Sequence, residues 1–160
     1  MTRQWAVTGT AVLVAALLVP AAVAHADPVA PRPNAACPQL PAGTLTRLTD
    51  GQTLLQCQKG HWVPFTDIYP SSDIWLTYGP ELTLHGQARP NPEIKAGSWT
   101  GIPQSPGSQC SAQQSDVIDA GNMAPPQILT GDPGQPLALA LTTQLATITL
   151  DGDCLWQRQP

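Results

Sequence analysis

The amino-acid sequence predicts an all-β protein, a small antiparallel β-sandwich or barrel that is preceded by a three-stranded, disulfide-linked meander. Several short segments alternate apolar and polar residues, which is the period of a strand with one buried face. Turn residues separate these segments at roughly the 8–12-residue spacing of sandwiches and barrels. Four cysteines supply the crosslinks typical of a small exported domain.

The first element is a cleaved secretory signal peptide over residues 1–26. Arg3 supplies the positive start, an apolar run covers residues 11–19, and an A-x-A cleavage site follows at residues 24–26. An uncleaved membrane anchor is the alternative, because residues 5–24 are just long enough to span a bilayer. Polar and helix-breaking residues dilute that stretch, so we expect cleavage, secretion and no membrane span in the mature chain.

Residues 27–36 predict a disordered leader, because they contain three prolines and little apolar mass. The meander follows over residues 37–66. Asp50-Gly51 suits a two-residue type I′ turn between residues 45–49 and 52–58, and Lys59-Gly60 suits a second tight turn before His61.

Residues 67–160 predict the sandwich-like domain. Alternation indicates strands near residues 74–78, 82–85, 137–141 and 146–150. Asp151-Gly152 then predicts a closing hairpin that leads into the C-terminal strand.

The four cysteines allow three pairings. Pairing neighbours, Cys37 with Cys57 and Cys110 with Cys154, closes the shorter loops and staples each β-region separately. The other two pairings would tie the two regions together. We expect the neighbour pairing, with each bridge contributing about 3–4 kcal/mol.

Composition excludes several classes of partner. Without Arg3 the mature chain has 6 basic and 11 acidic residues, a net charge of about −5, and its basic residues do not cluster. Nucleic acid and anionic membranes both need a basic patch, so neither is an expected partner.

Known catalytic and metal-binding patterns are missing from the sequence. His61 and His85 are the two histidines of the mature chain, and their spacing with other ligands fits no zinc motif. No serine lies in a G-x-S-x-G context. We therefore expect no metal, no cofactor and no catalytic residue.

The tryptophans are the candidate binding residues. Trp75 and Trp156 are expected in the core, whereas Trp62 and Trp99 lie beside polar turns. If exposed, those two side chains could form an aromatic platform for a sugar or a protein partner.

Residues 54–62 read L-L-x-C-x-x-G-x-W and resemble a hairpin of small disulfide modules in bacterial surface and pilin-tip proteins. Cys110 with the closing Asp153-Cys154-Leu155-Trp156 resembles small secreted actinobacterial β-proteins. The alanine-rich signal and the leader resemble mycobacterial exported proteins. The resemblance implies an extracellular or cell-wall location and a β fold, and most such proteins have no assigned activity.

Together these observations predict a secreted, non-enzymatic binding or structural module whose partner is an envelope or extracellular ligand or protein. The alternative is a hydrolase of envelope polysaccharide or ester. Such an enzyme would use paired carboxylates, for which Glu81, Glu93 and Asp116 are the candidates.

Overall fold

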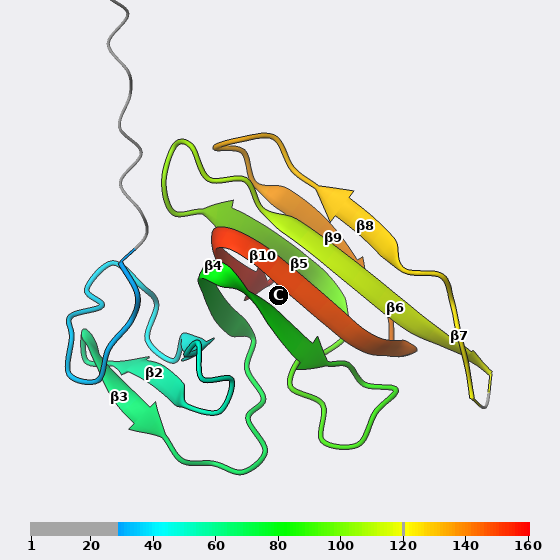
Figure 1. Ribbon diagram of the computed structural model, residues 1–160, viewed down its shortest axis with the longest axis horizontal. Helices are drawn as coiled ribbons and strands as arrows, with labels where there is room; N and C mark the ends of the chain where they lie inside the picture. Colours follow the sequence, from blue (N-terminus) through cyan, green and yellow to red (C-terminus); the bar gives the residue numbers. More distant parts are fainter. Residues whose placement is uncertain (1–28, 120) are drawn as a thin grey trace, which may run out of the picture.

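The computed structural model describes residues 29–119 and 121–160, and this part of the chain is all-β, as predicted, with no helix. The predicted signal peptide, residues 1–26, lies outside the described residues. In Figure 1, β2 and β3 lie on one side of the molecule, and β5, β6, β8, β9 and β10 lie on the other. The described residues form ten strands: β1 (Leu45–Arg47), β2 (Leu54–Gln58), β3 (His61–Phe65), β4 (Ile74–His85), β5 (Gly97–Pro103), β6 (Ser111–Asp119), β7 (Asn122–Met123), β8 (Gln127–Thr130), β9 (Leu137–Leu141) and β10 (Leu145–Arg158).

The longest strand, β10, organises the sheet. One of its edges pairs with β4 along nearly the whole strand. The other edge pairs with β6 over the first half of β10 and with β5 over the second half. β8 continues the sheet beyond β6, and β9 continues it beyond β5. Because the neighbour of β10 changes midway, two stretches of sheet diverge from it and enclose the apolar side chains.

The predicted hairpin at Asp151-Gly152 is wrong, since β10 runs through both residues without reversing. Gly152 has a φ of 94°, and the register with β4 shifts between Leu150 and Gly152. The glycine therefore uses its conformational freedom for a bulge inside a long strand rather than for a turn. Pairing with neighbouring strands on both edges keeps β10 extended through this point.

The sheet is mixed rather than purely antiparallel. β1 runs parallel to β4 at Leu45 and Trp75, and the Thr46 hydroxyl donates to the carbonyl of Leu76 over 2.9 Å. This contact joins the meander to the rest of the molecule in one sheet. The strands of residues 37–66 and those of residues 67–160 thus belong to one sheet.

The two turns of the meander differ from each other. Lys59 and Gly60 both have positive φ, 52° and 79°, which confirms the predicted tight turn. The connection at Asp50-Gly51 is longer than the predicted two residues. The backbone hydrogen bond that closes it runs from the N–H of Leu48 to the carbonyl of Thr53. The Asp50 carboxylate accepts backbone N–H bonds within this loop and stabilises the wider turn.

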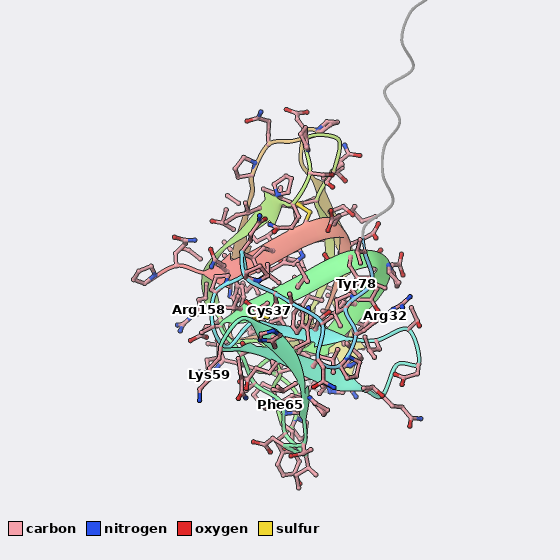
Figure 2. The ribbon with its side chains drawn as sticks, turned by 90° about the vertical axis from the view of Figure 1, so that its left-hand side faces the viewer. Arg32, Cys37, Lys59, Phe65, Tyr78 and Arg158 are labelled. Atoms are coloured by element: carbon pink, nitrogen blue, oxygen red, sulfur yellow. A yellow bond between two sulfur atoms is a disulfide. The ribbon has the colours of Figure 1, made fainter. Side chains whose placement is uncertain are left out.

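The prediction of a disordered leader is wrong for its described end. Pro31 is buried, and the backbone N–H of Asn34 donates to the Trp62 carbonyl over 2.7 Å. Ala36 forms a bridge with His61. The free edge of β3 supplies the hydrogen-bond partners that a proline-rich segment lacks by itself, and this end of the molecule faces the viewer in Figure 2.

Both predicted disulfides are confirmed, Cys37 with Cys57 and Cys110 with Cys154. Each belongs to its own buried cluster. The smaller cluster lies under the meander and includes Trp62. The larger one lies between the diverging stretches of sheet and contains three fully buried indoles, those of Trp75, Trp99 and Trp156.

Candidate functional site

The predicted aromatic platform is not present, because both candidate tryptophans are buried. Trp62 is 3% exposed and Trp99 is 1% exposed. Trp62 packs in the cluster around the first disulfide. Trp99 packs in the larger core, and its indole N–H donates to the Lys95 carbonyl over 2.9 Å. Neither ring presents a face to a ligand, so the interpretation of these residues as a binding surface is wrong.

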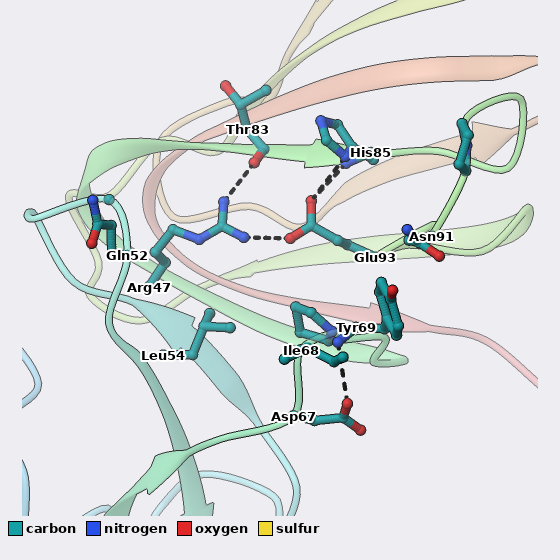
Figure 3. Close-up of a pocket in the computed structure, with 13 residues that line it drawn as sticks. Arg47, Gln52, Leu54, Asp67, Ile68, Tyr69, Thr83, His85, Asn91 and Glu93 are labelled. Carbon is teal, nitrogen blue, oxygen red and sulfur yellow. Dashed lines mark hydrogen bonds and ion pairs between the residues drawn. The ribbon is translucent and has the colours of Figure 1, made fainter.

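A cleft of about 610 Å³ lies instead where the meander meets β4. We call it the Arg47 cleft. The 66–73 loop forms one wall, β4 forms the opposite wall, and the loop after β4 closes one end (Figure 3). Its lining residues are Arg47, Gly51, Gln52, Leu54, Asp67, Ile68, Tyr69, Pro70, Thr83, His85, Pro90, Asn91 and Glu93.

An ion pair between Arg47 and Glu93 forms the floor of this cleft. Arg47 also donates from Nη1 to the Thr83 carbonyl over 3.0 Å. The second carboxylate oxygen of Glu93 accepts the backbone N–H of His85 over 2.9 Å. The Glu93 side chain is only 10% exposed. Both charges are therefore compensated where they are partly desolvated, as a buried pair requires.

The backbone around Glu93 is held as firmly as its side chain. Its N–H donates to the His85 carbonyl over 2.9 Å, and its carbonyl accepts the indole N–H of Trp75 over 3.3 Å. Trp75 itself is fully buried. The loop after β4 is thus anchored to the core at Glu93, and the floor of the cleft is formed before any ligand arrives.

The mouth of the cleft is, by contrast, apolar and open. Ile68 is 80% exposed and Tyr69 is 56% exposed. The Asp67 carboxylate accepts the backbone N–H of Tyr69 over 3.1 Å and fixes the course of the loop there. Figure 3 shows Ile68 and Tyr69 across the cleft from Thr83 and His85. A large exposed aliphatic side chain beside an aromatic one is a common feature of binding sites.

The predicted carboxylates do not assemble into one site. Glu93 lies in the Arg47 cleft, whereas exposed Glu81 lines a smaller neighbouring hollow of about 270 Å³. Asp116 lies on β6, where its carboxylate accepts from the Thr142 hydroxyl. Only Glu93 and His85 come together, with 3.9 Å between the carboxylate Oε2 and the imidazole Nδ1. His61 lies apart, in the meander.

Residues 29–119 and 121–160 hold no cluster of three or more metal-ligating side chains. The same residues include no helix of the length and hydropathy needed to cross a membrane.

Sequence reasoning missed Arg47, Ile68 and Tyr69. Arg47 and Glu93 are 46 residues apart in the chain and meet only because β1 pairs with β4. The adjacent apolar pair in the loop of residues 66–73, which is otherwise rich in turn residues, was the available signal.

Comparison with protein-family models, with curated proteins and with solved structures gives no significant match for this chain.

Proposed function

We propose that this chain is an exported, non-enzymatic binding module of the cell envelope or the extracellular space, and that the Arg47 cleft is its ligand site. The observation that carries the proposal is the contrast between the floor and the mouth of the cleft. The floor charges of Arg47 and Glu93 compensate each other, while Ile68 and Tyr69 stay exposed above them. Such a site is preorganised for binding, which lowers the entropy cost of taking up a ligand.

The bonding of Glu93 favours binding over hydrolysis. One carboxylate oxygen engages the Arg47 guanidinium and the other accepts a backbone N–H, so both are occupied by the fold. A general acid or base must exchange a proton with its substrate within hydrogen-bond reach. Glu93 serves better as a structural anion here, and Glu81 and Asp116 lie outside the Arg47 cleft.

Export is supported by the A-x-A pattern at residues 24–26 and by the two disulfides, which persist in oxidising compartments. The actinobacterial, mycobacterial-type affiliation rests on the resemblance of the cysteine-tryptophan ending and of the signal. These features support a ligand in the envelope or outside the cell.

Co-sedimentation with the isolated envelope of the producing organism tests the proposal. We expect the purified protein to sediment with the envelope and to release no soluble sugar or acyl product. The double variant Ile68→Ser/Tyr69→Ser removes the exposed apolar mouth and should stay in the supernatant. Ile118→Ser is the matched control, since Ile118 is 64% exposed on β6.

Two results would contradict the proposal. Sedimentation unaffected by the double variant would place the ligand elsewhere on the molecule. Release of soluble product by the wild type, lost in a folded Glu93→Gln variant, would instead assign a hydrolase.

A further inference from the structure

The Arg47 cleft continues onto an open sheet face. Thr83 and His85 line the cleft from β4, and in the register of the sheet they lie opposite Thr149 and Thr147 of β10. Those two residues lie opposite Gln113 and Ser115 of β6. Residues directly opposite one another in a ladder point to the same face. We call the face formed by these six residues the hydroxyl face.

The other side of the same strands is the core. Leu82, Leu150 and Ala112, which alternate with the residues of the hydroxyl face, are all buried. The hydroxyl face therefore points outward. Thr83 and Gln113 are exposed, and the hydroxyls of Thr83 and Thr149 lie 3.0 Å apart.

The hydroxyl face has no Asp, Glu, Lys or Arg side chain among its six residues, and the cleft beside it holds a compensated ion pair. Glu81 and Asp151, two residues from Thr83 and Thr149, are acidic. A polyanion bound on this face would therefore lie near two carboxylates. The four hydroxyls and the Gln113 amide of this face suit a neutral ligand that is itself rich in hydroxyls, because each of these groups can both donate and accept.

The direction of the row argues against an extended peptide. The row Gln113–Thr149–Thr83 crosses three strands, of which β6 and β10 are paired on both edges at this row and β4 is paired only with β10. A peptide strand gains its affinity from main-chain bonds along a free sheet edge, so it would lie along the outer edge of β4 and not along this row. A polyol chain needs only side-chain partners. Strands lie about 4.8 Å apart, a spacing close to the length of one sugar residue in an extended chain.

From these observations we infer that the Arg47 cleft and the hydroxyl face together form one elongated site for a neutral polysaccharide, with the Tyr69 ring stacking on a sugar in the cleft. The inference rests on the proposed binding function and names its ligand class. Aromatic faces pack against the apolar face of a sugar ring, while the row of hydroxyls and amides bonds the sugar hydroxyls. The chain would lie across the strands from the mouth of the cleft to Gln113.

Affinity electrophoresis of the full exported protein tests this site. The probes are soluble galactan, mannan, β-glucan and dextran, with polygalacturonate as the anionic comparison. We expect at least one neutral polysaccharide to retard the protein and polygalacturonate to leave it unaffected. Tyr69→Ala and Thr149→Val should each raise the dissociation constant about three- to tenfold.

Matched controls separate the site from general surface effects. Ile118→Ala removes an equally exposed apolar side chain from β6, and Thr143→Val removes an exposed hydroxyl from the turn before β10. Both control variants should bind as the wild type does. The urea midpoints of all four variants should differ from that of the wild type by no more than a single surface substitution usually causes. That agreement shows that a loss of binding is local.

Retardation by polygalacturonate alone, or by none of the polysaccharides, would overturn the inference. Retardation that neither Tyr69→Ala nor Thr149→Val weakens would also overturn it. Each of these results is compatible with envelope binding that depends on Ile68 and Tyr69, in which case the binding function stands and its ligand is not a neutral polysaccharide. Loss of both behaviours would overturn the two proposals together.

Discussion

Glu93 is the residue on which the geometry of the cleft depends. Its side chain bonds Arg47 and the backbone of His85, and its carbonyl accepts from Trp75. The residue thus connects β1, the end of β4 and the core. A single residue with three such partners determines both the shape of the floor and its charge balance.

Glu93→Gln should lower the free energy of unfolding by about 1–3 kcal/mol, because it leaves the Arg47 guanidinium without its counter-charge in a partly buried place. Glu81→Gln, at an exposed position of β4, is the control and should change little. Urea unfolding of both variants checks this. Equal effects of the two substitutions would show that the ion pair is not a structural support.

Asp153 predicts a pH dependence of stability. Burial raises the pKa of its carboxyl above the ordinary value of 3.8, and the Ser108 hydroxyl opposes that rise. Between the two values the folded state binds more protons than the unfolded state. The free energy of unfolding therefore falls as the pH rises from 3.8 through the raised value of the folded state.

Asp153→Asn removes this ionisation. The free energy of unfolding of the variant, measured relative to that of the wild type, should therefore be higher at pH 7 than at pH 4. Urea midpoints at the two pH values measure it. A difference between Asp153→Asn and the wild type that is equal at both pH values would contradict the assignment.

At the scale of the elements, the parts that the sequence predicts well are those set by local chemistry. Lys59-Gly60 forms its tight turn because both residues tolerate positive φ. Leu137, Leu139 and Leu141 alternate and are buried as expected. Asp151-Gly152 has the same turn chemistry as a hairpin, and it became a bulge because long-range pairing of β10 outweighs local preference.

The residues that form the Arg47 cleft could not be predicted from local sequence patterns. Trp62 and Trp99 adjoin polar turns in the chain, yet strand pairing turns both rings into the core. Of the cleft residues, Glu93 and His85 were identified as ionisable candidates. Their partner Arg47 lies on β1, and no local sequence pattern predicts the parallel pairing of β1 with β4.

The disulfide between Cys110 and Cys154 ties the start of β6 to the middle of β10, and both half-cystines are fully buried. Replacing both by alanine should cost about 2–5 kcal/mol. The Cys37–Cys57 pair closes a shorter loop, 20 residues against 44, so its removal should cost less. Urea unfolding of the two double variants compares them, and a larger loss at Cys37 and Cys57 would contradict this ranking.

At the scale of the whole molecule, one sheet joins a disulfide-pinned meander to a larger core. The Arg47 cleft lies at the junction of these two parts, and the hydroxyl face continues outward from it. The position of the cleft explains why it is well supported. Leu82, Leu84 and Ile94 of the larger cluster are the chain neighbours of the cleft residues of β4 and of Glu93, so these walls are anchored in the core.

The proposed function requires export, since the disulfides need an oxidising compartment and a ligand in the envelope lies outside the cytoplasm. The most direct measurement is intact-mass analysis with N-terminal sequencing of the protein recovered from culture medium and envelope. We expect a mature chain that begins at Asp27 and whose four cysteines are all oxidised. Recovery only as a full-length, membrane-bound species with reduced cysteines would contradict the account.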